Sequence, residues 1–460
     1  MNVMVPDLLA YEKWYEDHEK EILRDFFTFL KFPSISADSS YHSDVRRCAE
    51  WLQHYLNSMG MKTSLWETSG QPVVFASYLT AGSHRPTLLL YHHYDVQPID
   101  PLELWTSDPF TPTVRDHRVY ARGCSDNKGQ CFYSITALRA FLQLCKKVGI
   151  NIKLFIEGEE ESGGKGTEEV LSRKKTELAA DHLLVVDSGL PEPGIPAITI
   201  GVRGIVTMEV ACHNAKIDLH SGSHGGIALN PNRALVQLLA KLWDESGKVA
   251  VPHFYEDVHA LSFEEKALID LSFDTEKYIE QFGVHAFAPE PGYSIAESSR
   301  LRPTLEINGM SGGYAGRGFK TVIPASALAK ISCRLVSDQD PEKIAQLIFD
   351  FLKAHAPKGL ELKFSLLHGA KAFRSKIDSP IAKTVAKAYE EVLNQPCKNL
   401  IMGGSIPIVP SLAKVTGAET ILMGYGLDDD DIHAPNEHFG LDRFKQGFLT
   451  IGRILSLLSQ

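Results

Sequence analysis

Five short segments of the chain carry acids and histidines of the types that bind divalent metal ions. The residues are His93 and Asp95 in HHYDVQ, Asp126 in GCSDNKG, Glu160 and Glu161 in EGEEESGG, Asp187 in VVDSG, and His433 in DDDIHAPNE. Two neighbouring ions need a bridging carboxylate with nitrogen and oxygen ligands around it, a mixture that zinc, manganese and cobalt accept. The set therefore predicts a carboxylate-rich site for two metal ions.

The spacing within two of these segments predicts a division of roles. Residues two apart on an extended segment point the same way, so Asp95 is placed to orient the imidazole of His93. Glu160 and Glu161 are adjacent and cannot point identically, so one is expected to bind metal while the other faces the reacting water. A general base so placed suits metal-assisted hydrolysis. Each feature alone is weak: a His-x-Asp pair is common by chance, an acidic EGEEE stretch is more often a solvated loop, and a lone Asp187 is more often a cap or a turn.

Short apolar runs and helical patterns alternate along the first part of the chain. A helical pattern covers residues 8–30, and the apolar runs cover residues 73–79, 87–91, 152–156 and 183–186. This alternation predicts strands buried on both faces of an α/β sheet. Most of the candidate ligands follow the ends of these runs, which is where the sites of such sheets gather.

The pattern changes after Gly201 and returns to the earlier alternation near Asp378. The block between these points reads as a smaller α+β domain inserted into the first one. We therefore expect a discontinuous, metal-binding catalytic domain of residues 1–205 and 376–460, interrupted by an inserted domain of residues 206–375.

Composition excludes several classes of protein. The 460 residues, 44% of them hydrophobic and 23% charged, are typical of a globular protein with room for two domains. The net charge of −10 argues against a nucleic-acid partner. There is no apolar stretch of the roughly 20 residues that span a bilayer, no basic start of a secretory signal, and no paired-cysteine motif. We expect a cytoplasmic protein with no membrane partner.

Seven segments, in order along the chain, resemble the di-zinc aminopeptidase-like metallopeptidases. That family includes glutamate carboxypeptidase, acetylornithine deacetylase, succinyl-diaminopimelate desuccinylase and the carnosine-type dipeptidases, and the dipeptidases are the most similar. The segments are HHYDVQ, RGCSDNKG, EGEEESG, DLHSGSHGG, GRGFKTVIPASA, GGSIPIV and His-x-x-Asn-Glu at 433–437. The resemblance spans nearly the whole chain. It implies a phosphorylase/aminopeptidase-like α/β catalytic domain with a mixed central sheet flanked by helices, plus a ferredoxin-like α+β lid and dimerisation domain.

The resemblance also implies which residues bind which metal ion. His93, Asp126 and Asp187 would surround one ion. Asp126 would bridge to a second ion, held by Glu161 and His433. Zinc is the expected metal, with manganese or cobalt as alternatives.

Further roles are carried over from the family in the same way. Glu160 becomes the general base that activates a metal-bridging water, and Asp95 becomes the orienting residue. His220 matches a residue that the family supplies across a dimer to the neighbouring active site, where it would donate a hydrogen bond to the oxyanion. Arg334 matches an arginine that pairs with the free carboxylate of the substrate. The other implied substrate contacts are Thr321, His368, Gly404 and Ser405.

Residue types alone leave both substrate-side assignments open. His220 lies in a loop rich in serine and glycine, where a histidine is usually structural, and only the resemblance selects it. Arg334 could instead form a salt bridge within the inserted domain.

The sequence thus predicts a metallopeptidase, dipeptidase or carboxypeptidase-like, that cleaves the amide bond of dipeptides or short peptides with a free C-terminal carboxylate. It would act as a homodimer, with His220 reaching across subunits. An N-acyl amino acid deacylase, of deacetylase or desuccinylase type, is the alternative, because that reaction also breaks an amide beside a free carboxylate. A binding protein that keeps the metals without turnover is the alternative outside enzymes. The intact ligands and Glu160 favour an enzyme.

Overall fold

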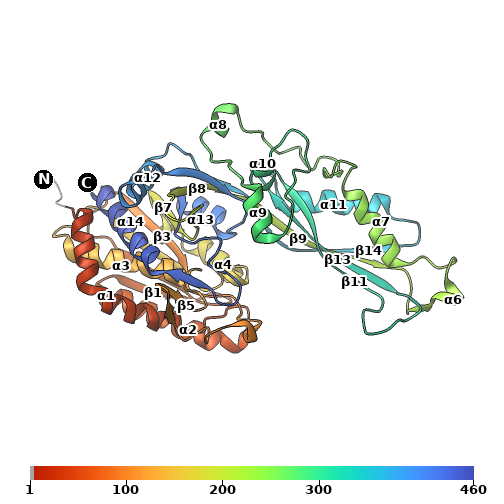
Figure 1. The fold of residues 1–460 in the computed structure, drawn as a ribbon, viewed down its shortest axis with the longest axis horizontal. Helices are drawn as coiled ribbons and strands as arrows, with labels where there is room; N and C mark the ends of the chain where they lie inside the picture. Colours follow the sequence, from red (N-terminus) through yellow and green to blue (C-terminus); the bar gives the residue numbers. More distant parts are fainter. Residues whose placement is uncertain (1–4) are drawn as a thin grey trace. The chain divides into compact units, whose positions relative to one another are not determined.

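The computed structural model describes residues 5–460, which form two compact units (Figure 1). Of the described residues, the first unit contains 5–200, 375–400 and 408–460, and the second contains 201–374 and 401–407. Residues 401–407, expected in the catalytic domain, group with the second unit because Gly403 and Gly404 accept hydrogen bonds from Arg203.

A mixed sheet forms the centre of the first unit. The strand order is β1-β2-β6-β3-β7-β17-β8-β15, with β16 paired to β8. The neighbours β6, β3, β7 and β17 run parallel, and the remaining pairs along this order are antiparallel. The strands are β1 Lys62–Trp66, β2 Val73–Tyr78, β3 Thr87–His93, β6 Asn151–Glu157, β7 His182–Val186, β8 Ala197–Val202, β15 Phe373–Arg374, β16 Lys398–Met402 and β17 Glu419–Met423.

Helices flank this sheet in two groups. One group comprises α1 Leu8–Leu30, α2 His42–Ser58, α3 Lys128–Leu144, α12 Pro380–Leu393 and α14 Leu441–Ser459. Stacked and tilted aromatic pairs among Phe26, Phe29, Trp51, Phe132 and Phe444 join α1, α2, α3 and α14. Such pairs add to the free energy gained by burying the rings. The other group comprises α4 Lys165–Arg173, α5 Lys175–Leu178 and α13 Ile408–Thr416.

The second unit is built on a four-stranded antiparallel sheet. Its chain order is β9 Gly204–His213, α7 Pro231–Leu239, β11 Thr304–Gly312, β13 Ser326–Leu335, α11 Pro341–His355 and β14 Glu361–Ala370. The strand order is β11-β13-β9-β14, which is the ferredoxin-like βαββαβ arrangement. Burial alternates along β9 and β13, and their buried residues form one core with residues of α7 and α11. The role of this unit as a lid and dimerisation domain stays a prediction.

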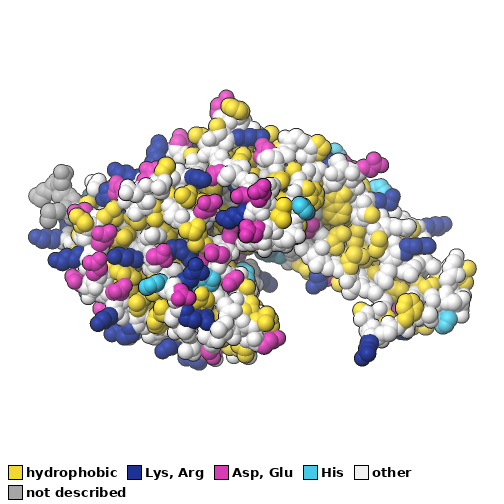
Figure 2. All heavy atoms as spheres, viewed as in Figure 1, with side chains coloured by type: hydrophobic (Ala, Val, Ile, Leu, Met, Phe, Trp, Pro, Cys, Tyr) yellow, Lys and Arg dark blue, Asp and Glu magenta, His cyan; other side chains and the backbone are white. Residues whose placement is uncertain are grey.

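Short elements complete the chain. Residues between α7 and β11 form α8 Phe263–Ala267, α9 Thr275–Phe282 and α10 Ile295–Arg300, and a two-stranded ribbon joins β10 Leu219–His220 to β12 Val322–Ile323. Among residues 5–460, no helix is both long and apolar enough to cross a membrane. Figure 2 shows acidic and basic side chains interspersed over the visible face, so no large area there carries one sign of charge. The cytoplasmic location stays a prediction.

Candidate metal centre

Three neighbouring parallel strands bring the first group of candidate ligands to one edge of the central sheet. His93 is the last residue of β3, Asp187 directly follows β7, and the turn Glu160–Ser162 follows β6. Because β6, β3 and β7 run parallel, their carboxyl ends lie at the same edge. The apolar runs that became β3, β6 and β7 therefore end at the edge of the sheet where the candidate metal ligands gather.

Two loops add Asp126 and His433 to this edge. Asp126 immediately precedes Asn127, the N-cap of α3, and His433 lies in the loop between β17 and β18 His438–Gly440. His93 Nε2 lies 2.9 Å from Asp126 Oδ1, and His433 Nε2 lies 3.0 Å from Asp126 Oδ2. Asp126 therefore turns one carboxylate oxygen toward each histidine, which is the arrangement that a bridging ligand needs.

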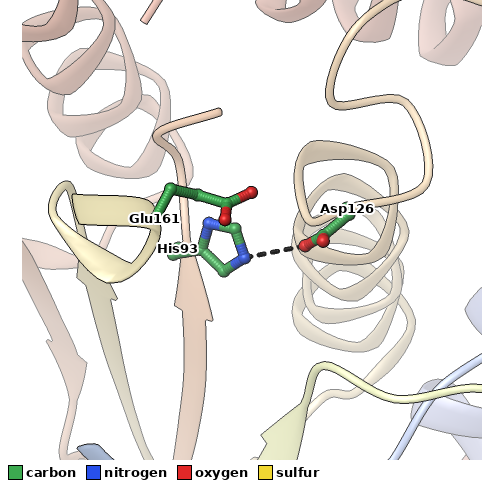
Figure 3. A group of neighbouring side chains, drawn as sticks. All are labelled: His93, Asp126 and Glu161. Carbon is green, nitrogen blue, oxygen red and sulfur yellow. Dashed lines mark hydrogen bonds and ion pairs between the residues drawn. The ribbon is translucent and has the colours of Figure 1, made fainter. Parts of the chain in front are cut away.

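Glu161 and Asp187 stand on either side of this arrangement. Glu161 Oε1 is 3.3 Å from His433 Nε2, and Asp187 Oδ1 is 3.6 Å from His93 Nε2. Figure 3 shows Glu161 and Asp126 converging on the His93 ring. One ligand atom from each of these three residues lies within 4.8 Å of the others. The five predicted ligands thus gather in two sets that share Asp126.

The donor atoms fit divalent metal ions. Glu161 Oε1 is buried without a hydrogen-bond partner, which is costly for a carboxylate oxygen unless a cation binds it. The remaining donors are imidazole nitrogens and carboxylate oxygens, a set that suits zinc, manganese or cobalt.

The electrostatics of the cluster lead to the same conclusion. Burial raises the pKa of Glu161 to about 7, and the Asp126 carboxylate adds to the rise. The hydrogen bond to Asp126 and the nearby Glu161 carboxylate raise the pKa of His433 to about 10. Burial raises the pKa of Glu160 well above its usual range, with the carboxylates of Glu161 and Asp187 contributing. These three pKa values rise because buried carboxylates crowd together and favour bound protons. Divalent cations would supply the same positive charge.

Asp95 lies behind His93. The Nδ1 atom of His93 is 3.1 Å from the backbone oxygen of Asp95 and 3.3 Å from its Oδ1. The Asp95 carboxylate also accepts hydrogen bonds from Ser36 Oγ at 2.6 Å and from the backbone nitrogens of Glu160 and Glu161 at 3.3 and 3.0 Å. One buried carboxylate therefore holds both the imidazole and the turn that carries the two glutamates.

Arg334 and Ser405, predicted as substrate contacts, lie together in the second unit. Arg334 Nη1 donates to Ser405 Oγ at 2.9 Å, and Ser405 Oγ donates to the backbone oxygen of Arg203. Gly404 precedes Ser405, and its backbone oxygen accepts from Arg203 N at 3.1 Å. Among residues 5–460, no carboxylate forms an ion pair with Arg334, so the salt bridge considered from the sequence is not made.

His368 and Arg334 project from the same face of the four-stranded sheet. His368 pairs with Thr207, and Arg334 pairs with Ile205 two residues earlier on the same strand. Paired residues share a face, and so do residues two apart on a strand. This is the half-buried face of the sheet, opposite the core.

His220 and Thr321 lie side by side at the β10–β12 ribbon. His220 pairs with Val322, and the backbone oxygen of Thr321 accepts from the nitrogen of Ser221 at 3.1 Å. The exposed His220 ring accepts two backbone hydrogen bonds at Nδ1, from Gly222 and Ser223. Because Nδ1 is an acceptor, the neutral ring carries its proton on Nε2, where it remains available as a donor.

Three residues that contact the candidate metal ligands or their loops were not predicted from the sequence. Gln97 and Asn127 each donate a side-chain amide to a ligand carboxylate, and Glu437 accepts hydrogen bonds from the loop that carries Asp126. All three residues stand in segments that the sequence had singled out. Only their polar type signalled a role, because such a contact can be recognised only once the distances are known.

Comparison with known proteins gives the family. Residues 89–456 match the model of peptidase family M20/M25/M40. The chain belongs to this family. As an M20 peptidase it is a metal-dependent hydrolase of peptide bonds, and the family resemblance read from the seven segments is confirmed.

The M20 relatives include dipeptidases and a carboxypeptidase. The Cys-Gly metallodipeptidase DUG1 of Candida albicans is 29% identical over 93% of this chain and 92% of its own. The Beta-Ala-His dipeptidase of Rattus norvegicus is 30% identical over 82% of this chain and 78% of its own. The solved M20 family metallo-carboxypeptidase Sso-CP2 from Sulfolobus solfataricus is 31% identical, with a TM-score of 0.86 over 95% of this chain and 99% of that one. The predicted α/β fold with a mixed central sheet is confirmed.

Proposed function

We propose that this M20 peptidase hydrolyses the amide bond of dipeptides or short peptides that carry a free C-terminal carboxylate, using two metal ions. The observation that carries the proposal is the placement of Asp126, whose two oxygens face two histidines on different loops. The dipeptidase relatives support the choice of substrate.

The proposed ligands divide between two ions. His93 and Asp187 would hold one ion, Glu161 and His433 the other, and Asp126 would bridge them. Zinc is the first choice, and manganese or cobalt would fit the same donors. When bound, the ions would lower the pKa of a water molecule and polarise the scissile carbonyl.

Glu160 is the proposed proton carrier. It takes a proton from the attacking water and later returns it to the nitrogen of the leaving amine. Burial raises the pKa of Glu160, and the carboxylates of Glu161 and Asp187 add to the rise, which favours retention of the proton between the two steps. The hydrogen bond from its backbone nitrogen to Asp95 fixes the turn from which it projects.

Arg334 is the proposed anchor for the carboxylate of the substrate. Its guanidinium has no ion-pair partner among the described residues, so its charge is available to a ligand. Ser405, Gly404, His368 and Thr321 are the further proposed contacts. An N-acyl amino acid carries the same carboxylate, so Arg334 alone does not separate a dipeptidase from a deacylase.

A substrate panel tests this proposal. We expect cleavage of Cys-Gly and β-Ala-His, and little cleavage of N-acetyl or N-succinyl amino acids. Arg334→Met should lower kcat/KM for dipeptides roughly 30-fold or more, because removing one partner of a desolvated charge pair costs about 2 kcal/mol or more.

The control for that panel is Arg233→Met, which removes an exposed arginine from α7 of the same unit. A dipeptide amidated at its C-terminus should be cleaved equally slowly by the wild type and by Arg334→Met. Arg334 would not be the carboxylate anchor if Arg334→Met lowered kcat/KM by the same factor for the free dipeptide and for the amidated one. If N-acyl amino acids were cleaved in preference to dipeptides, the enzyme would be an N-acyl amino acid deacylase and not a dipeptidase.

His220 is proposed to act in the active site of a partner subunit within a homodimer. If so, His220→Ala and Glu160→Gln should each be inactive alone yet active when coexpressed. In a mixed dimer, one site combines an intact Glu160 with an intact His220, so about a quarter of wild-type activity is expected from random pairing.

The control pairs Glu160→Gln with Asp126→Asn, whose defects lie in the same site and should not complement each other. Coexpressed His220→Ala and Glu160→Gln that stay inactive would argue that His220 serves its own subunit.

A further inference from the structure

Glu437 lies four residues after His433, and both oxygens of its carboxylate accept hydrogen bonds from the loop that carries Asp126. The side chains of Glu437 and Arg122 form an ion pair in which each is 1% exposed. Oε2 accepts two hydrogen bonds from the loop, and Oε1 accepts two more. The four donors are Arg122 Nη1 at 2.9 Å, Gly123 N at 2.8 Å, Ser125 N at 3.0 Å and Asp126 N at 3.1 Å.

These contacts give Glu437 a positioning role and exclude that of a ligand. A carboxylate offers about four acceptor sites, and all four are filled by this one loop. One donor is the backbone nitrogen of Asp126 itself, so the bond fixes the residue whose side chain faces both histidines. The same side chain ties the segment after His433 to that loop, which couples the positions of ligands far apart in the sequence.

Gln97 and Asn127 make a different kind of contact. Gln97 Nε2 donates to Glu161 Oε2 at 2.7 Å, and Asn127 Nδ2 donates to Asp187 Oδ1 at 2.7 Å. Gln97 donates to Oε2, whereas Glu161 Oε1 has no hydrogen-bond partner and lies 3.3 Å from His433 Nε2. Each side-chain amide therefore orients one ligand carboxylate, and the hydrogen bonds of these amides go to Glu161 and Asp187 and not to the Asp126 carboxylate.

We propose that Glu437 positions Asp126 for both metal ions, whereas Gln97 and Asn127 each position a ligand of one ion. The proposal rests on the ligand assignment of the proposed function. A variant of Glu437 should therefore weaken the binding of both ions, whereas a variant of Gln97 or Asn127 should weaken the binding of one. Partners that orient metal ligands typically change metal affinity roughly 10–100-fold when they are replaced.

The test is a competition titration of the full-length, metal-free protein with zinc and a chelator, which gives the affinity of each ion without measuring turnover. Glu437→Gln places an amide NH₂ against N–H donors and leaves Arg122 without its anion, so both affinities should fall roughly 10–100-fold. Gln97→Met keeps the size of the side chain and removes the donor, so only one affinity should fall.

The matched control is Glu290→Gln, which breaks a second buried arginine–glutamate pair, with Arg302, in the second unit. Thermal unfolding of the metal-free proteins shows how much each substitution weakens the fold. We expect Glu290→Gln to lower the unfolding temperature and leave both zinc affinities unchanged. If Glu437→Gln yields no folded protein, Glu437→Asp, which keeps the charge but shortens the reach, should show a smaller loss for both ions.

Two outcomes would overturn the inference. One is wild-type affinity for both ions in Glu437→Gln, or in Glu437→Asp if only that variant folds. The other is a loss confined to one ion. His93→Ala and His433→Ala test the ligand assignment separately: each should lose one ion, and unchanged binding in both would reject the proposed metal centre itself.

Discussion

Glu160→Gln is expected to lower kcat for dipeptide hydrolysis roughly 10²–10⁴-fold, the usual contribution of a general acid–base group. Glutamine keeps the size and shape of the side chain, but its amide can neither take a proton from water nor return one to the leaving amine. The variant should still bind both metal ions, because Glu160 is outside the proposed ligand set. Steady-state kinetics and metal content per chain provide the measurement.

Glu159→Gln is the matched control for this substitution. The Glu159 carboxylate packs against Gly70 and Gly166, so closely that a Cβ atom at Gly70 would clash with its Oε1 and one at Gly166 with its Oε2. The side chain is therefore directed toward these glycines and not into the metal cluster. It should keep nearly all of the wild-type kcat. A Glu160→Gln enzyme with unchanged kcat would remove Glu160 from the proton-transfer role, and loss of bound metal would reassign it as a ligand.

Asp126→Asn is expected to weaken both metal ions at once and to reduce activity roughly 10³-fold or more, because the chemistry that bound metal supplies is lost with them. Asp126 places Oδ1 2.9 Å from His93 Nε2 and Oδ2 3.0 Å from His433 Nε2. Asparagine offers one oxygen and turns an NH₂ group toward the other position. Metal content and kcat should therefore fall together.

The control is Asp428→Asn, an exposed acid in the loop that also carries His433. It removes the same charge from the protein without touching the cluster, so metal content and kcat should stay at wild-type values. If Asp126→Asn retained two tightly bound ions, Asp126 would not be the bridging residue.

Local sequence patterns predicted much of the first unit. The helical pattern over 8–30 became α1 Leu8–Leu30, and its N-cap, Asp7, accepts from the backbone nitrogen of Ala10. The runs that became β2, β3, β6 and β7 were also found, because an apolar run bounded by polar residues is a local signal. The order of the strands was not predicted, since it depends on pairing between distant segments.

Non-local pairing also explains where the sequence underestimated an element. Within the inserted block, the apolar run over residues 304–307 predicts a short strand. The observed strand β11 continues to Gly312, past an Asn308–Gly309 pair that is typical of a turn. A register shift between Ile307 and Gly309 absorbs the irregularity, and residues 309–312 pair with 327–330 of β13. Tertiary pairing therefore overrides the local turn preference.

At the proposed metal centre, the sequence indicated the candidate ligands but not the residues that position them. His93, Asp126 and His433 stand in motifs that can be recognised in the sequence. Asp126 nevertheless contacts a histidine 33 residues away, His93, and another 307 residues away, His433. The hydrogen bonds of Gln97 and Glu437 depend on loop conformations that no spacing rule encodes. A buried carboxylate that accepts four bonds is visible only when the fold has brought its donors together.

The most direct test of the central claim is a metal titration of dipeptide hydrolysis. Chelator-stripped protein would receive zinc in steps while bound metal and the release of free amino acids from Cys-Gly and β-Ala-His are measured. The account predicts no cleavage by the stripped protein and a rate that rises to a plateau at two ions per chain. Cleavage by the stripped protein at the loaded rate, or two bound ions with no cleavage of any dipeptide, would contradict it.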